Sequence, residues 1–166
     1  MDTGARVEGK QMPSRTRVEH GEVAVSNDPG DVLEARDLAA CVAICMFDPI
    51  ANVGGLAHVV LPSSTIQDGP TRPAVFADRA VPLLIEAMTE KGAQPTHLKV
   101  TMAGGAEFIG ATADDPVGGL GRRTVDAIDG LLRARRIDVT QRSVGGLGSR
   151  CVELRLGEGR VVVDPE

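Results

Sequence analysis

Two apolar runs in the first half of the chain constrain its fold more than any other feature. Residues 41–47 read Cys-Val-Ala-Ile-Cys-Met-Phe and end at Asp48-Pro49, and a second run extends over residues 53–61 until Pro62. Each run has the length of a buried strand or of a short helix, and apolar periodicity alone cannot decide between the two. Because the chain has three Phe and no Trp or Tyr, its core must be built from Val, Leu, Ile, Ala and Met.

The rest of the chain mixes strands with two helices. One helix is predicted over residues 77–91, because apolar residues recur there on one face and Gly92 supplies a stop. A second helix is predicted over residues 122–135. Strands are predicted over residues 32–38, 96–102, 137–140, 151–156 and 160–163. This mixture indicates the α/β class, an α+β layered sandwich in which mixed β-sheets pack with two main helices.

Length and charge limit the domain organisation and the partners. The 166 residues fit one domain, and we expect a disordered leader over residues 1–20 before a single domain over 21–166. The net charge of -5 offers no basic surface to nucleic acid or anionic lipid. No apolar run reaches the roughly 18 to 20 residues that cross a bilayer, and the N-terminus lacks a secretory signal. We therefore expect a cytoplasmic protein without nucleic-acid binding or membrane insertion.

Three cysteines and three histidines are the first candidates for chemistry. The cysteines are Cys41, Cys45 and Cys151, and their odd number and spacing fit neither a disulfide framework nor a paired zinc motif. Reduced thiols and no metal are the simple expectation. His20 lies in the polar leader and His97 at the start of a predicted strand, so both are expected to be solvated.

His58 and Cys41 form a possible catalytic pair. His58 lies within an apolar run, where burial of an imidazole costs free energy unless it finds a hydrogen-bond partner. Cys41 lies at the junction between a polar turn and an apolar run, a position that suits exposure. A cysteine nucleophile needs an adjacent base or a lowered pKa, which His58 would supply. The alternatives are a satisfied core histidine and a small buried hydrophobe.

Both runs closely resemble the CheD family, which reads Ser-Cys-Val-Ala-Val-Cys…Asp-Pro and then Gly-Gly-Met-Ala-His…Leu-Pro. This chain has the same separation between its Cys and its His. The later matching segments are Phe-Ala-Asp-Arg-Ala-Val at 76–81, Ala-Gly-Gly-Ala at 103–106, Gly-Arg-Arg-Thr-Val at 121–125 and Val-Gly-Gly at 144–146 followed by Arg150. The likeness covers roughly residues 21–164 and implies an α/β sandwich.

CheD proteins are known as chemoreceptor glutamine deamidases of chemotaxis. The resemblance therefore implies a hydrolase, a protein-glutamine glutaminase, with Cys41 as nucleophile and His58 as base. It implies no cofactor. The implied partners are the cytoplasmic domains of methyl-accepting chemoreceptors, with a CheC-like phosphatase as a further candidate.

The chain departs from the family immediately before Cys41. The family usually reads Thr-Leu-Gly-Leu-Gly-Ser there, whereas residues 35–40 read Ala-Arg-Asp-Leu-Ala-Ala. The threonine is the third member of the family's catalytic set, and Ala35 has no hydroxyl with which to orient His58. Hydroxyls at residues 63–65 (Ser-Ser-Thr) are candidates for a replacement.

The two lost glycines raise a second question about the same turn. Asp37 and Ala39 stand in their places, and either residue is strained if the turn needs a positive φ there. Two hypotheses follow: an active deamidase, or a CheD-like binding module with little or no catalysis. A small cysteine peptidase would need the same pair, but no other feature supports it. An activated Cys41 is expected to alkylate well below pH 8.

Overall fold

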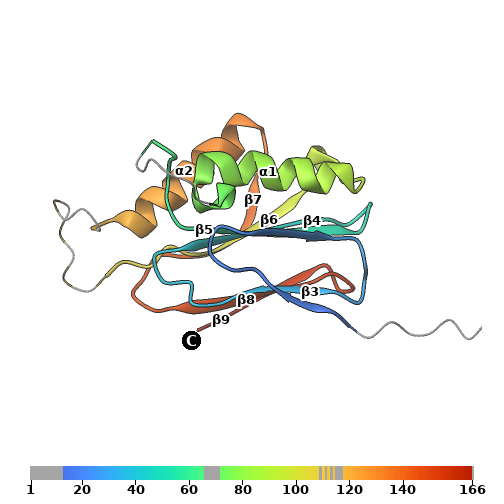
Figure 1. The fold of residues 1–166 in the computed structure, drawn as a ribbon, viewed down its shortest axis with the longest axis horizontal. Helices are drawn as coiled ribbons and strands as arrows, with labels where there is room; N and C mark the ends of the chain where they lie inside the picture. Colours follow the sequence, from blue (N-terminus) through green and yellow to red (C-terminus); the bar gives the residue numbers. More distant parts are fainter. Residues whose placement is uncertain are drawn as a thin grey trace, which may run out of the picture.

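Two β-sheets and a pair of helices form three layers (Figure 1). The computed structural model describes residues 13–65, 72–108, 110, 112, 114 and 118–165. The strands are β1 (Arg15–Arg17), β2 (Val23–Ser26), β3 (Val32–Ala35), β4 (Val42–Asp48), β5 (Val53–Val59), β6 (Lys99–Gly104), β7 (Val139–Val144), β8 (Arg150–Arg155) and β9 (Arg160–Pro165). The helices are α1 (Ala77–Glu90) and α2 (Leu120–Ala134), with short 3-10 helices η1 (Pro73–Val75) and η2 (Pro95–His97).

The two sheets differ in their number of strands and in the elements that pack against them. Five strands form one sheet in the order β2-β5-β4-β6-β7, and four form the other in the order β1-β3-β8-β9. Both contain antiparallel pairs and one parallel pair, β6 with β7 and β1 with β3. Helices α1 and α2 cover one face of the five-stranded sheet, and the four-stranded sheet faces its other side (Figure 1). This confirms the predicted α+β layered sandwich of mixed sheets and two helices.

The two apolar runs are the strands β4 and β5. Both strands are buried along their whole length, because helices cover one face of their sheet and the second sheet covers the other. Alternate residues of β4 therefore enter different cores. Val42, Ile44 and Met46 pack beneath the helices, whereas Ala43, Cys45 and Phe47 pack between the sheets. A strand buried on both faces shows a continuous apolar run instead of an alternating one, which explains the ambiguity in the sequence.

The helices lie close to their predicted positions. Helix α1 packs buried apolar residues against the five-stranded sheet and ends just before Gly92, whose φ of +102° suits glycine. Helix α2 begins two residues before the predicted start and buries Val125, Ile128 and Leu132. No helix in the described part of the chain is long and apolar enough to span a membrane.

The N-terminal boundary differs from the prediction. Residues 15–17 of the expected leader form β1, which pairs in parallel with β3, and Val18 is buried between the sheets. Folded chain therefore begins before residue 21, and residues 1–12 lie outside the described residues. Strand β6 begins at Lys99, later than predicted, because Pro95–His97 form a 3-10 turn. Residues 66–71 also lie outside the described residues.

Candidate active site

The pairing of β4 with β5 brings Cys41 and His58 to the same end of the five-stranded sheet. Cys41 immediately precedes β4, and His58 is the penultimate residue of β5. The strands are antiparallel, with Val42 opposite Val59 and Ala43 opposite His58. The start of one strand therefore meets the end of the other, which is why residues 17 positions apart in the sequence become neighbours.

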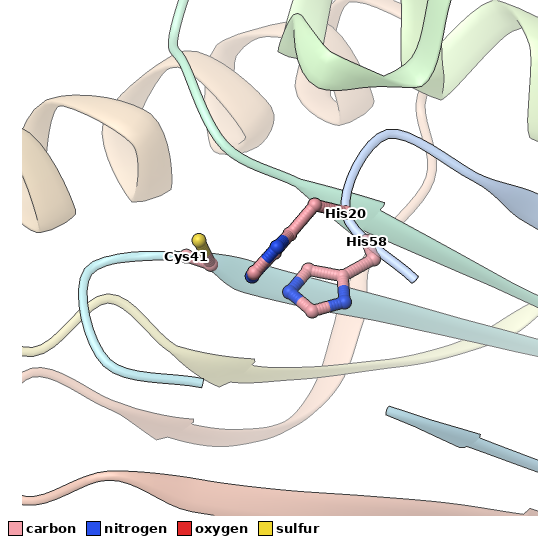
Figure 2. A group of neighbouring side chains, drawn as sticks. All are labelled: His20, Cys41 and His58. Atoms are coloured by element: carbon pink, nitrogen blue, oxygen red, sulfur yellow. The ribbon is translucent and has the colours of Figure 1, made fainter. Parts of the chain in front are cut away.

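The side chain of a third residue, His20, lies beside this pair. The Cys41 sulfur and one ring nitrogen from each histidine all lie within 4.8 Å of one another. The rings of His20 and His58 meet edge to face, with their centroids 4.4 Å apart. Figure 2 shows the His20 ring between the Cys41 sulfur and the His58 ring. The expectation that His20 is a solvated leader residue misses this contact: its side chain is exposed, but it borders the site.

A main-chain carbonyl orients His58. Its Nδ1 lies 3.1 Å from the carbonyl oxygen of Val18, and because a carbonyl can only accept, Nδ1 carries the proton. The Nε2 atom then has a free lone pair, and it has no hydrogen-bond partner within the described residues although His58 is 1% exposed. In Figure 2 this nitrogen points toward the side of the ring where His20 and Cys41 lie. This is the arrangement that a general base needs.

The hydroxyl groups at residues 63–65 do not replace the missing threonine. Ala35 is fully buried in β3, opposite Val152, within the core between the sheets. The Ser63 hydroxyl bonds to that of Thr65, and the Ser64 hydroxyl donates to Asp78. The orienting group is therefore the Val18 carbonyl, which no sequence motif marks.

The Val18 carbonyl is fixed because residues 18–22 cross from one sheet to the other. The Val18 amide donates to Glu34 in β3, 2.8 Å away. The Gly21 amide donates to the His58 carbonyl at 2.9 Å, and the His58 amide donates to Glu22 at 3.1 Å. This crossing segment is thus bonded to β3 at one end and to β5 at the other, and it carries both the orienting carbonyl and His20.

Cys41 is held by the loop that follows β6. Its carbonyl accepts a hydrogen bond from the Gly105 amide at 2.9 Å, and the Ala106 amide donates to Ala39 at 2.7 Å. Gly104 has a φ of +107°, and a Cβ on it would overlap the Cys41 carbonyl oxygen. Gly104 therefore has no side chain because it lies directly against the backbone of Cys41.

Arg150 ties two further glycine segments to the same turn. Its backbone exchanges two hydrogen bonds with Leu38, at 3.0 and 3.2 Å. Its guanidinium donates to the carbonyls of Gly104 and Gly145, at 3.2 and 2.6 Å. The Val-Gly-Gly segment at residues 144–146 and Arg150 thus stabilise the turn before Cys41.

The turn itself needs a positive φ at one of the two positions where the family has glycine. Asp37 has a φ of +56°, whereas Ala39 is not among the residues with positive φ. Asp is one of the few residues that enter this region with a small penalty. The Asp37 carboxylate also pairs with Arg17 of β1 at 3.2 Å, on the surface.

Burial shifts both members of the pair toward their neutral forms. It raises the pKa of the Cys41 thiol. It also lowers the pKa of the His58 imidazole, an effect that the hydrogen bond to Val18 partly opposes. At neutral pH the pair is thus a thiol beside a neutral base, not a preformed thiolate with an imidazolium. The expectation of alkylation well below pH 8 does not fit this environment.

The other cysteines and His97 lie elsewhere. Cys45 is buried between the sheets, and burial raises its pKa to about 12. Cys151 is half-buried in β8, with its sulfur 3.7 Å from the carbonyl of Asp164. His97 lies 3.5 Å from Asp48, at the opposite end of β4 from Cys41.

Comparison with known proteins agrees with the resemblance noted in the sequence. The family model described as CheD chemotactic sensory transduction matches residues 60–165. The chemoreceptor glutamine deamidase CheD of Thermotoga maritima is 37% identical over 86% of this chain and 87% of its own length. A probable chemoreceptor glutamine deamidase CheD from Caldanaerobacter subterraneus is 33% identical over 89% of this chain and 90% of its own.

Another relative, the probable chemoreceptor glutamine deamidase CheD 2 of Anaeromyxobacter dehalogenans, is 38% identical over 86% of this chain and 89% of its own. A crystal structure of the hypothetical protein YfiH from Bacillus licheniformis has a TM-score of 0.40 and 15% identity, over 72% of this chain and 44% of that one, which is too distant to support an argument. The family model and the long alignments at more than 30% identity show that this chain belongs to the CheD family.

Proposed function

We propose that this protein is a chemoreceptor glutamine deamidase, which hydrolyses glutamine side chains of receptor cytoplasmic domains to glutamate and ammonia during chemotaxis adaptation. The relatives with which it aligns carry that activity in their names. The observation that carries the proposal is His58: its Nδ1 is fixed by Val18, and its Nε2, which has no hydrogen-bond partner among the described residues, lies on the side of the ring where His20 and Cys41 lie. A binding module has no need for an oriented base beside a thiol.

Cys41 and His58 act in two half-reactions. His58 Nε2 takes the thiol proton as the Cys41 sulfur attacks the carboxamide carbon of the substrate. The carbon–nitrogen bond then breaks, and His58 returns the proton so that ammonia leaves and a thioester remains. In the second half, His58 draws a proton from water, which attacks the thioester, and the released sulfur takes the proton back. Glutamate is the product.

The oxyanion that forms on the substrate needs hydrogen-bond donors. The amides of Ala40 and Cys41 donate to no acceptor among the loop and side-chain hydrogen bonds of the described residues. They belong to Cys41 and to the residue before it, so we assign the oxyanion hole to them. In other acyl-transfer enzymes, one such donor is worth roughly 3 to 4 kcal/mol in the transition state.

The alternative of a non-catalytic module rests on the lost threonine and glycines. The Val18 carbonyl takes over the orienting role of the threonine, and Asp37 adopts the positive φ of one glycine. Both objections to catalysis are thereby weakened. We further propose cytoplasmic localisation and a CheC-like phosphatase as a second partner, both on the family resemblance; co-purification with a CheC-like protein from the same organism tests that partner.

Mass spectrometry of a receptor cytoplasmic fragment tests the deamidase. The fragment is incubated with the protein, with Cys41→Ala, and with Cys151→Ser as a matched control away from the site. We expect a site-specific gain of glutamate with the unmodified protein and with Cys151→Ser, and none with Cys41→Ala. Equal glutamate in all three samples, or none in any while a known deamidase modifies the same fragment, would overturn the proposal.

A further inference from the structure

His20 has no part in the proposed reaction, yet its ring lies against the catalytic pair. Its side chain is exposed, and its ring nitrogens make no hydrogen bond in the described part of the chain. With Cys41 and His58 it forms the one group of three metal-ligating side chains among the described residues, with all ligand atoms within 4.8 Å of one another. The unpartnered Nε2 of the buried His58 points into this group.

The donor set fits a borderline-soft cation. Two imidazoles and a thiolate are ligands that Zn²⁺ prefers, whereas the group contains no carboxylate of the kind that Mg²⁺ and Ca²⁺ require. The Nδ1 of His58 donates to the Val18 carbonyl, which fixes the ring for ligation through Nε2. Zinc-binding histidines typically have such a partner on their second nitrogen.

The geometry needs a small movement of one side chain. Around a tetrahedral zinc ion the ligand atoms lie about 3.3 to 3.8 Å apart, somewhat closer than the 4.8 Å limit of this group. His58 is buried and fixed, and the Cys41 carbonyl is bonded to Gly105. The exposed His20 ring is therefore the group that turns inward to complete the site.

We propose that His20, Cys41 and His58 form a Zn²⁺ site with an open fourth position, and that its occupation reversibly blocks the deamidase. Binding converts the Cys41 thiol into a zinc-bound thiolate and releases its proton to solvent. The same sulfur and the same His58 lone pair serve both purposes, so a zinc-bound protein cannot start acyl transfer. The blocking effect rests on the proposed function, whereas the metal site does not.

Calorimetric titration of the full chain with Zn²⁺, under a reductant that does not bind the metal, tests the site. We expect one Zn²⁺ per chain, at least tenfold weaker binding in His20→Gln and Cys41→Ser, and unchanged binding in the matched variants His97→Gln and Cys151→Ser. Co²⁺ in place of Zn²⁺ should give a sulfur-to-metal charge-transfer band that Cys41→Ser abolishes. Unchanged affinity in His20→Gln, or a loss confined to His97→Gln or Cys151→Ser, overturns the assignment.

A deamidation assay separates this inference from the proposed function. Zn²⁺ should stop the reaction and a chelator should restore it, and His20→Gln should need at least tenfold more Zn²⁺ for half inhibition. Zn²⁺ binding that depends on His20, in a protein that deamidates nothing, would refute the function and keep the metal site. Deamidation that Zn²⁺ does not inhibit, or that Zn²⁺ inhibits equally in the unmodified protein and in His20→Gln, would refute the inference and keep the function.

Discussion

Cys41 and His58 lie on neighbouring strands, but different kinds of contact hold them. The turn before Cys41 is bonded to the loop after β6, to the backbone of Arg150 and, through Asp37, to Arg17. His58 lies inside a strand, and among the described residues its ring has one hydrogen bond, to the carbonyl of Val18. Cys41 thus depends on several segments distant in sequence, and His58 on its own strand and a single carbonyl.

This difference shows where the contacts of the segment before Cys41, which departs from the family pattern, come from. The partners of the turn lie outside it, at residues 104–106, 145 and 150, and they contact its backbone. Within residues 35–40 the constraints are the burial of Ala35, Leu38 and Ala40 and the positive φ at Asp37. The His58 ring is likewise oriented by a backbone carbonyl, that of Val18, and not by a hydroxyl group.

The largest effect is expected from Gly104→Ala, which disturbs the nucleophile side. The new Cβ would overlap the Cys41 carbonyl oxygen, and Ala is strained at a φ of +107°. We expect the free energy of unfolding to fall by roughly 2 to 5 kcal/mol, as measured by urea denaturation. Gly148→Ala is the matched control, since a Cβ there meets nothing within 4 Å. Equal stabilities of the two variants would contradict this account of the turn.

A smaller loss is expected from Arg150→Met. The substitution keeps most of the apolar stem but removes the guanidinium that binds the carbonyls of Gly104 and Gly145. We expect the free energy of unfolding to fall by about 1 to 3 kcal/mol. The alkylation rate of Cys41 should also change, because its turn loosens. Arg160→Met, at an exposed position of β9, should change neither the free energy of unfolding nor the alkylation rate of Cys41. A similar loss of stability in that variant would contradict the role assigned to Arg150.

The pH dependence of deamidation tests the environment assigned to His58. Burial lowers the pKa of His58, so its neutral form persists as the pH falls, and proton acceptance fails only below the usual imidazole pKa of about 6.5. An unperturbed histidine would be about one quarter neutral at pH 6, and we expect clearly more activity than that. Burial raises the pKa of Cys41, so its alkylation at pH 8 should be slower than that of free cysteine. An acid limb above pH 6.5 would contradict the assigned environment of His58.

The smallest effect is expected from Asp37→Gly. Glycine adopts the φ of +56° without strain, and the variant loses one exposed ion pair with Arg17. We expect a net gain of about 0.5 kcal/mol in the free energy of unfolding. Ala39→Gly, two residues later and without a positive φ, should lower it by a similar amount. The same sign in both variants would show that backbone conformation does not explain the turn.

The sequence predicts the helices and strands in which buried apolar residues recur at a regular spacing. Strands β4 and β5 appear as apolar runs, and both helices lie within about two residues of their predicted ends, because burial repeats regularly along them. Strand β1 has no such pattern, since its three residues are all exposed at a sheet edge. Any such strand is invisible to hydrophobic periodicity.

The candidate site also contains residues that the sequence indicates and residues that it does not. Cys41 and His58 could be proposed from residue type and family resemblance, whereas His20 and the Val18 carbonyl could not. Every residue has a carbonyl, so an orienting carbonyl leaves no trace in the sequence. The place of His20 depends on the path of residues 18–22 between the sheets, which is a long-range property of the fold.

Strand β1 and the crossing segment after it make the orientation of His58 sensitive to partial unfolding. Only three residues pair at this edge, and much of their attachment is ionic, through Arg15 with Glu34 and Glu153 and through Arg17 with Asp37. Short edge strands open at a lower free energy than the core, and salt screens exposed ion pairs. Detachment of β1 would carry Val18 and His20 away while the rest of both sheets stays folded. Ionic strength is therefore expected to regulate how long His58 stays oriented, through three exposed residues at the edge of the smaller sheet.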